Sequence, residues 1–390
     1  MVGIIQEQHP DRCRLFMQWK NMDWPIVVDS LDLLGVSVVP ITLAIDEHGI
    51  IRHTRPQPDA DWLEANFLSK TYEAPSGQSP PRAARRPDLK NFQRRVEHQA
   101  HSVRGVRFDT SRAYADALVM WAPAKRLGEA IKNYRRALAR RPDDGPAHFR
   151  LGVAYRKRFD SPEHRPSDFQ KAVDHWSASL EIDPNHYIRR RRIQQYGPRQ
   201  MKPYPFYDWV PRAREEIRSR GEEPVPLRIE PGGAEFARPA RQFESSNSPR
   251  KDPDPKGRIT RDEGLIRTEV TVVPPIVKPG QSARVHVVFR PDASRKAHWN
   301  NESGASVLWI NPPPGSKVDS CLQALPTGRG AVSRESRAVE FEVQCAEDAR
   351  PGTIRVPMYA LYYVCEDAGG KCLYRRRDMT IGLKIGTDTP

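Results

Sequence analysis

Two cysteines near the end of the chain, Cys365 and Cys372, have the spacing best suited to chemistry. Six residues separate them, Gly369 and Gly370 included, and glycine tolerates the positive φ angles that a tight turn needs. The two thiols can therefore meet across the end of a β-hairpin. A pair that closes and reopens is suited to thiol–disulfide exchange. A pair that stays closed is a structural disulfide, and the spacing allows both.

Charged neighbours predict that Cys372 is the more acidic of the two thiols. Lys371 adjoins it, and three arginines follow at 375–377, whereas two acidic residues follow Cys365. Nearby cations lower a thiol pKa.

The other three cysteines have less informative surroundings. Cys321 and Cys345 flank a strand-rich interval, and we interpret them as candidates for a structural disulfide, with buried free thiols as the alternative. Cys13 lies near a predicted helix start between two arginines, which predicts a lowered thiol pKa; the alternative is an ordinary lone cysteine. No cluster of metal ligands is recognisable, so we predict no metal and no cofactor.

Composition limits the classes of protein to consider. The chain has 390 residues and a formal charge of +14, enough length for two or three domains. Its basic residues are scattered without a glycine-aromatic signature, so nucleic acid is not a favoured partner. No apolar run approaches the roughly 20 residues of a membrane span. The sequence lacks a Gly-x-Ser-x-Gly motif, a phosphate loop and a Gly-x-Gly-x-x-Gly motif.

The first 73 residues alternate between strand and helix patterns. We expect strands at 2–5, 25–29, 41–45 and 50–53, and helices at 10–22, 31–34 and 59–67. Asp46 to Gly49 is a hairpin turn signal. The pattern is that of a small α/β unit.

Residues 35–51, Gly-Val-Ser-Val-Val-Pro-Ile-Thr-Leu-Ala-Ile-Asp-Glu-His-Gly-Ile-Ile, resemble the thioredoxin-like redoxins. The resemblance implies a cis bond between Val39 and Pro40, with Pro40 contacting substrate. In that family a Cys-x-x-Cys motif precedes the strand with which this chain begins, so residues 1–73 would be a partial domain lacking its active-site half. We therefore expect Met1 not to be the true start; the alternative is that the segment is a degenerate remnant of the domain. An upstream start would favour the periplasm or cell envelope, and otherwise the cytoplasm is expected.

A linker at 74–90, rich in proline and arginine, precedes a helical region at 91–222. A repeat is visible there, because Ala130, Tyr134, Ala137 and Pro142 recur 42 residues later as Ala172, Trp176, Ser179 and Pro184. Together with Leu151, Gly152 and Tyr155, this pattern resembles a tetratricopeptide repeat, with an insertion at 159–166 explaining a period longer than the usual 34. Helices at 111–119 and 207–219 are expected to complete the stack. The resemblance implies a protein-contact surface or a spacer.

A second linker at 223–263 leads to alternating strand patterns at 264–386, which predict an antiparallel sandwich. Lys278-Pro279-Gly280, His298-Trp299-Asn300-Asn301 and Cys365-x6-Cys372 resemble the N-terminal immunoglobulin-like domain of bacterial thiol-disulfide interchange proteins. The resemblance implies that Cys365 and Cys372 are the catalytic pair, served by a thioredoxin-like electron donor and acting on disulfide-bearing protein substrates. The loop is one residue longer than the family's, and no aromatic cap loop is recognisable.

These patterns together predict a multidomain α+β protein. It would contain a partial thioredoxin-like segment, a helical middle like tetratricopeptide repeats and a C-terminal antiparallel immunoglobulin-like β-sandwich. The predicted function is thiol–disulfide exchange or electron relay through Cys365 and Cys372, as in a thiol-disulfide oxidoreductase. The alternative is a non-enzymatic scaffold whose helical repeats bind a protein partner and whose disulfides are structural.

Overall fold

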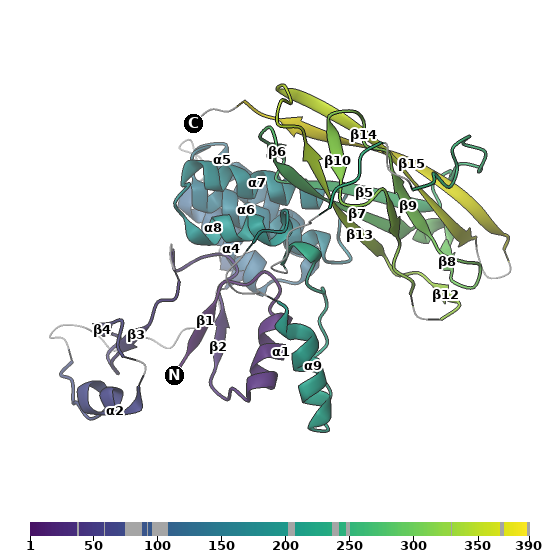
Figure 1. Cartoon of the computed structure of the whole chain (residues 1–390). Coiled ribbons are helices and arrows are strands. Elements are labelled where there is room, and N and C mark those ends of the chain that lie inside the picture. Colours follow the sequence, from purple (N-terminus) through teal and green to yellow (C-terminus); the bar gives the residue numbers. More distant parts are fainter. Residues whose placement is uncertain are drawn as a thin grey trace.

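The computed structural model confirms a mixed α+β protein (Figure 1). It describes residues 1–36, 39–57, 59–74, 88–91, 93–95, 108–201, 207–235, 242–246, 250–328, 330–366 and 370–387, with the backbone alone at 108–109. A small N-terminal α/β segment and a stack of helices lie beside a large β-structure (Figure 1).

The N-terminal segment has the expected strands, but they form two separate sheets. Its elements are β1 (Gly3–Ile5), α1 (Asp11–Lys20), β2 (Ile26–Val28), β3 (Leu43–Ile45), β4 (Ile51–Thr54) and α2 (Ala60–Leu63), which continues as a π-helical turn over Glu64–Leu68. β1 pairs with β2 in parallel, and β3 pairs with β4 as a hairpin. The helix expected at 31–34 is a turn, because the Asp29 carboxylate accepts hydrogen bonds from the backbone N–H groups of Leu33 and Leu34.

Five helices follow one another in an antiparallel stack. They are α4 (Phe108–Trp121), α5 (Leu127–Leu138), α6 (Gly145–Phe159), α7 (Asp168–Ile182) and α8 (Tyr187–Tyr196). The repeated positions on α5 and α7 are all fully buried in the helical core. The expected insertion forms the loop between α6 and α7. Gly152 on α6 lies so close to α7 that an added Cβ would be 2.4 Å from the Trp176 indole nitrogen.

The last predicted helix of the stack, α9 (Trp209–Ser219), packs elsewhere. Its Ala213 and Ile217 form a small core with Leu15 and Trp19 of α1, and the two helices lie side by side (Figure 1). The prediction that α9 completes the stack was therefore wrong. Its apolar face is covered by the N-terminal segment instead.

Two sheets of the β-structure share one hydrophobic core. The first has the order β10-β13-β7-β5, with β5 (Ile266–Val273), β7 (Ser282–Pro291), β10 (Ser316–Val318) and β13 (Arg337–Cys345). The second has the order β11-β9-β14-β15-β6, with β8 and β12 beside it: β6 (Ile276–Val277), β8 (His298–Asn300), β9 (Val307–Ile310), β11 (Leu322–Ala324), β12 (Val332–Ser333), β14 (Gly352–Cys365) and β15 (Cys372–Ile385). The pairings are antiparallel except β15 with β6. The six longest strands lie within the stretch 264–386 whose alternation predicted strands, and the shorter ones carried too little pattern to be recognised.

The described part of the expected linker at 223–263 packs against its neighbours. Glu235, Asp254 and Asp262 in it are buried, and Glu244 forms a β-bridge with Val318. A flexible linker would keep such carboxylates in water, because burying an unpaired charge is costly. The described residues of this stretch are therefore packed against neighbouring elements, although their polar composition looked unstructured.

Candidate functional site

Cys365 and Cys372 form a disulfide at the end of the β14–β15 ribbon. They are the last residue of β14 and the first of β15, and they lie directly opposite each other. The two sulfurs differ in environment, since Cys365 is only 3% exposed whereas Cys372 is exposed. An incoming thiol would therefore meet Cys372 first.

His298 lies beside the disulfide on the neighbouring strand. It is the register partner of Cys365 across the β8–β14 pairing, and directly opposite residues of antiparallel strands share one face of the sheet. His298, Cys365 and Cys372 thus form a row across that face. The His298 Nδ1 lies 3.3 Å from the Lys296 carbonyl, and the side chain is buried.

The arginines that follow Cys372 are partly committed to other partners. Arg376 pairs with Asp254 at 2.9 Å and with Asp378 at 2.8 Å. The Arg377 Nη1 lies 3.4 Å from the Asp262 carbonyl oxygen. Because Arg376 is neutralised by carboxylates, its effect on the thiol is reduced. A more acidic Cys372 stays a prediction.

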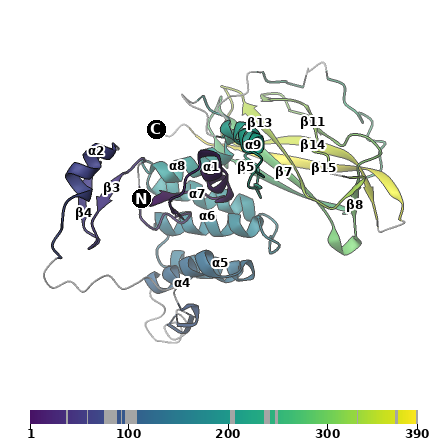
Figure 2. The ribbon, with the colours of Figure 1, turned by 90° about the horizontal axis from the view of Figure 1, so that it is seen from below.

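The structure does not bring Pro40 to the disulfide. The Val39–Pro40 bond is cis, and Pro40 lies just before the β3–β4 hairpin. That hairpin and the β8 end of the β14–β15 ribbon lie on opposite sides of the molecule in both views (Figures 1 and 2). Contact between Pro40 and a substrate stays a prediction.

Cys321 and Cys345 do not form the predicted disulfide. Both are buried thiols, and each is directed to a different piece of backbone. The Cys321 Sγ is 3.9 Å from the Ser245 carbonyl oxygen, whereas the Cys345 Sγ donates to the carbonyls of Lys278 and Gln281 at 3.2 and 3.3 Å. The alternative of two buried thiols is therefore the one found. Residues far apart in sequence determine the directions of the two side chains, so the sequence could not decide between the two.

The prediction that the thiol pKa of Cys13 is lowered is wrong. Its pKa is raised, first by burial and then by the Glu7 carboxylate, while Arg14 opposes the change. Arg12 does not contribute as expected, because it points away to form an ion pair with Glu235.

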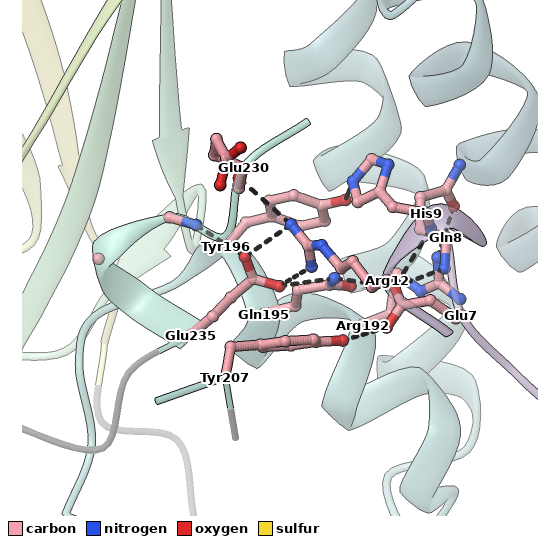
Figure 3. Close-up of polar contacts among 12 residues, drawn as sticks. Glu7, Gln8, His9, Arg12, Arg192, Gln195, Tyr196, Tyr207, Glu230 and Glu235 are labelled. Carbon is pink, nitrogen blue, oxygen red and sulfur yellow. Dashed lines mark hydrogen bonds and ion pairs between the residues drawn. The ribbon is translucent and has the colours of Figure 1, made fainter. Parts of the chain in front are cut away.

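That ion pair is the centre of a buried polar cluster that the sequence analysis missed (Figure 3). Arg12 and Glu235 are 2% and 3% exposed and share two hydrogen bonds, one of them 2.9 Å long. Gln195 of α8 donates to the same carboxylate at 2.8 Å. Burial alone would lower the pKa of Arg12, but Glu235 outweighs it and the pKa is raised. The cluster joins α1, α8 and the turn that holds Glu235.

A second buried arginine, Arg192, lies in the same cluster. It donates to the Gln8 side chain and, at 3.0 Å, to the Gln6 carbonyl. Arg189 and Arg192 of the basic run 189–192 are both buried, so the run is not a fully solvated helix face. A signal was available, since Ile188, Arg192 and Tyr196 recur every four residues and therefore share one helix face.

Comparisons with known proteins assign this chain to no family. No family model matches it, and no curated protein matches it. Solved structures resemble about a third of the chain: AvmM, which catalyses macrocyclization in alchivemycin A biosynthesis (12% identity, 34% of this chain and 97% of that one, TM-score 0.20), the yeast GGA1 GAE domain (14%, 32% and 96%, TM-score 0.21) and BslA, a bacterial hydrophobin (13%, 32% and 97%, TM-score 0.17). TM-scores this low support no conclusion about fold or function.

No helix in the described part of the chain is long and apolar enough to cross a membrane. The same residues contain no group of three or more His, Cys, Asp or Glu arranged to hold a metal ion.

Proposed function

We propose that Cys365 and Cys372 form a thiol–disulfide exchange site that reacts first at Cys372. The observation that carries the proposal is the asymmetry of the disulfide, which joins one buried and one exposed cysteine. Exchange requires a thiolate to approach the sulfur it attacks in line with the disulfide bond. Exposure of Cys372 permits that approach, and burial of Cys365 hinders it.

The chemistry would proceed in two balanced steps. A thiolate of a dithiol protein attacks the Cys372 Sγ, a new S–S bond forms, and the Cys365–Cys372 bond breaks with its electron pair passing to Cys365. The partner's second thiolate then attacks its own sulfur in the mixed disulfide and releases Cys372 as a thiolate. The partner leaves oxidised, and the chain has gained two electrons and, after protonation, two protons. The reverse sequence would reduce a disulfide-bearing substrate.

The proposal includes the finer assignments made from sequence. We propose that the β-structure is an immunoglobulin-like interchange domain and that α4–α8 form a stack of tetratricopeptide type. The N-terminal segment would be part of a thioredoxin-like domain. A thioredoxin-like protein would supply electrons, and disulfide-bearing proteins would receive them. The burial of the repeated positions and the location of the disulfide at a hairpin end support these assignments.

The midpoint potential of the full chain tests the proposal. Thiol trapping in graded redox buffers should give a midpoint between about −150 and −280 mV, the range of exchange proteins. A bond that is still oxidised in buffers below about −300 mV would be a structural disulfide and would overturn the proposal.

Two matched variants test the order of attack. In Cys365→Ser the exposed Cys372 thiol remains, whereas in Cys372→Ser the buried Cys365 thiol remains. We expect Cys365→Ser to form a mixed disulfide with glutathione disulfide at least ten times faster than Cys372→Ser. Equal rates would show that exposure does not determine which sulfur reacts.

A second candidate function, a protein-interaction scaffold, is favoured by a basic groove on α5, α6 and α7. The groove has a volume of about 620 Å³ and contains six basic side chains but no carboxylate among the described residues that line it: Lys132, Arg135, Arg136, Arg158, Arg165 and Lys171. It would suit an acidic protein segment. A fluorescent glutamate-rich peptide should bind at least five times more weakly to the Lys132→Ala, Arg135→Ala double variant. Arg212→Ala, an exposed arginine on α9, is the control and should bind normally.

A further inference from the structure

We infer that a cavity between the N-terminal segment and α8 binds a small organic anion that has an apolar body. The cavity measures about 490 Å³ and is lined by residues of β1, α1, α8, the start of α9 and Glu235. Small-molecule sites of proteins commonly measure 300–1,000 Å³. The cavity is thus large enough for a ligand of one or two rings.

One wall of this cavity is apolar and open to solvent at its rim. Ile5, Phe16 and Ile188 line it together with Ile4 and Val39. Ile4 and Val39 are 53% and 44% exposed, so a ligand could enter on their side. An apolar body placed against this wall would remove exposed apolar surface from water, which is favourable.

The other end of the cavity is polar and rich in guanidinium groups. Arg12, Arg191 and Arg192 line it, against the two carboxylates of Glu7 and Glu235. The described lining therefore has one more positive than negative side chain.

The carboxylates are not directed at Arg192. Glu235 is engaged by Arg12 and Gln195, and Glu7 accepts hydrogen bonds from Tyr207 and from the backbone N–H of Gln8. Arg192 itself has only the neutral oxygens of Gln6 and Gln8 as hydrogen-bond acceptors among the described residues.

Arg192 is therefore a buried cation without a carboxylate in direct contact. It is 3% exposed, and burial lowers its pKa, which agrees with an incompletely compensated charge. Its partners among the described residues are all neutral, namely the two glutamine oxygens and the rings of Phe149 and Trp176, whose centroids lie 5.5 and 5.8 Å from the guanidinium carbon. A buried charge without an opposite charge is costly, so an anion placed beside it would be stabilised. Carboxylate, sulfonate and phosphate groups suit a guanidinium because they accept two hydrogen bonds from it.

The pattern favours an anion over the other ligand classes. A cation would add to the excess positive charge, and a neutral apolar ligand would fill the wall while leaving Arg192 uncompensated. The elements β1, α1 and α8, whose residues line the cavity, lie away from the β8 end of the β14–β15 ribbon (Figures 1 and 2). The site is therefore independent of the proposed exchange chemistry.

Two dyes with similar apolar bodies test the charge requirement on the full chain. 8-Anilinonaphthalene-1-sulfonate has an anilinonaphthalene body with a sulfonate, and N-phenyl-1-naphthylamine has the same body without it. We expect saturable 1:1 binding of the sulfonate dye, and at least tenfold weaker binding of the neutral dye. Absence of saturable binding, or equal affinity for both dyes, would overturn the inference.

Cys13 provides an independent report of where the dye binds, because it lines the cavity. It is a partly exposed thiol, whereas Cys321 and Cys345 are buried and the other two cysteines are bonded. Saturating sulfonate dye should slow alkylation of Cys13 by iodoacetamide at least fivefold. An unchanged rate would show that the dye binds elsewhere and would overturn the inference.

Arg192→Gln tests the guanidinium, with Arg190→Gln on the exposed side of α8 as the matched control. The first variant should lose at least tenfold in affinity for the sulfonate dye and little for the neutral one, while the control should match the original protein. Unchanged binding by a folded Arg192→Gln variant would exclude Arg192 from the site. If that variant fails to fold, as circular dichroism would show, the dye pair and Cys13 protection decide the question.

Discussion

Gly152→Ala tests how closely α6 and α7 approach each other. A Cβ at this position would lie 2.4 and 2.5 Å from two atoms of the Trp176 ring and 2.9 Å from the backbone oxygen of Ala172. Trp176 is fully buried and stacks on Tyr196 with ring centroids 5.5 Å apart, so the ring cannot move freely. The added methyl must therefore push the helices apart or displace the ring.

Two opposing contributions determine the size of the effect. Alanine is favoured over glycine inside a helix by about 1 kcal/mol, which would stabilise the variant. Overpacking a core costs about 1–3 kcal/mol, and contacts below 3 Å with both a ring and backbone place this site at the upper end. We therefore expect a net loss of about 2 kcal/mol in the free energy of unfolding.

Urea denaturation, followed by circular dichroism, measures this loss. Gly128→Ala on α5 is the matched control, because the nearest atom to its added Cβ, the Arg158 Nη1, is 3.7 Å away; it should be neutral or slightly stabilising. Trp176→Leu should partly relieve the clash, so the double variant with Gly152→Ala should be more stable than the sum of the single effects by at least about 1 kcal/mol. If Gly152→Ala stabilised the protein as much as the control, the close crossing of α6 and α7 would be refuted.

Three further predictions follow from buried or half-buried ionisable groups. Glu235→Gln leaves Arg12 as a buried cation without its carboxylate and should lower the free energy of unfolding by about 3–5 kcal/mol. The double variant Arg12→Met, Glu235→Leu should recover most of this loss in urea denaturation. An equal loss in both variants would show that the unpaired charge is not its cause. Burial lowers the pKa of His175 to about 4, so between about pH 6.5 and 4 the unfolded chain binds a proton that the folded chain does not. The free energy of unfolding should therefore fall by at most about 3 kcal/mol as the pH drops across this range. Urea denaturation at several pH values should show a smaller fall for His175→Gln. Burial and the carboxylate of Glu7 raise the pKa of Cys13, so at pH 7.5 iodoacetamide should alkylate the Cys13 thiol more slowly than it alkylates the thiol of glutathione. Glu7→Gln should speed the alkylation of Cys13, and an unchanged rate would show that the carboxylate has no influence.

Local patterns predicted the elements well where one residue period dominates. The 42-residue repeat located the buried sides of α5 and α7. Its excess over the usual period of 34 residues located the loop between α6 and α7. Alternation located the longer strands, and the glycine pair correctly indicated that Cys365 and Cys372 meet. In each case the information lies within a few residues or in one repeat, where periodicity is a physical consequence of helix or strand geometry.

Long-range pairing could not be predicted in the same way. Arg12 and Glu235 are 223 residues apart, and neither has a neighbour that identifies the other as its partner. The packing of α1 on α9 likewise depends on two apolar faces with no sequence relation. The buried cluster and its cavity were missed for this reason, as was the role of the stretch after α9, whose polar composition suggested a linker.

The turn at Gly233–Glu235 links the three parts of the molecule to one another. Its Glu235 holds α1 and α8, while the N–H of Gly233 donates to Glu340 on β13 at 3.0 Å. His286 on β7 also reaches the Tyr196 carbonyl at 2.7 Å. These hydrogen bonds fasten the N-terminal segment, the helices and the sheets to one another. A protein bound to the helices would therefore lie at a constant distance and orientation from the Cys365–Cys372 bond. The chain would then select partners by the distance between the part that binds the helices and the part that reacts with the disulfide, as well as by the chemistry of each part.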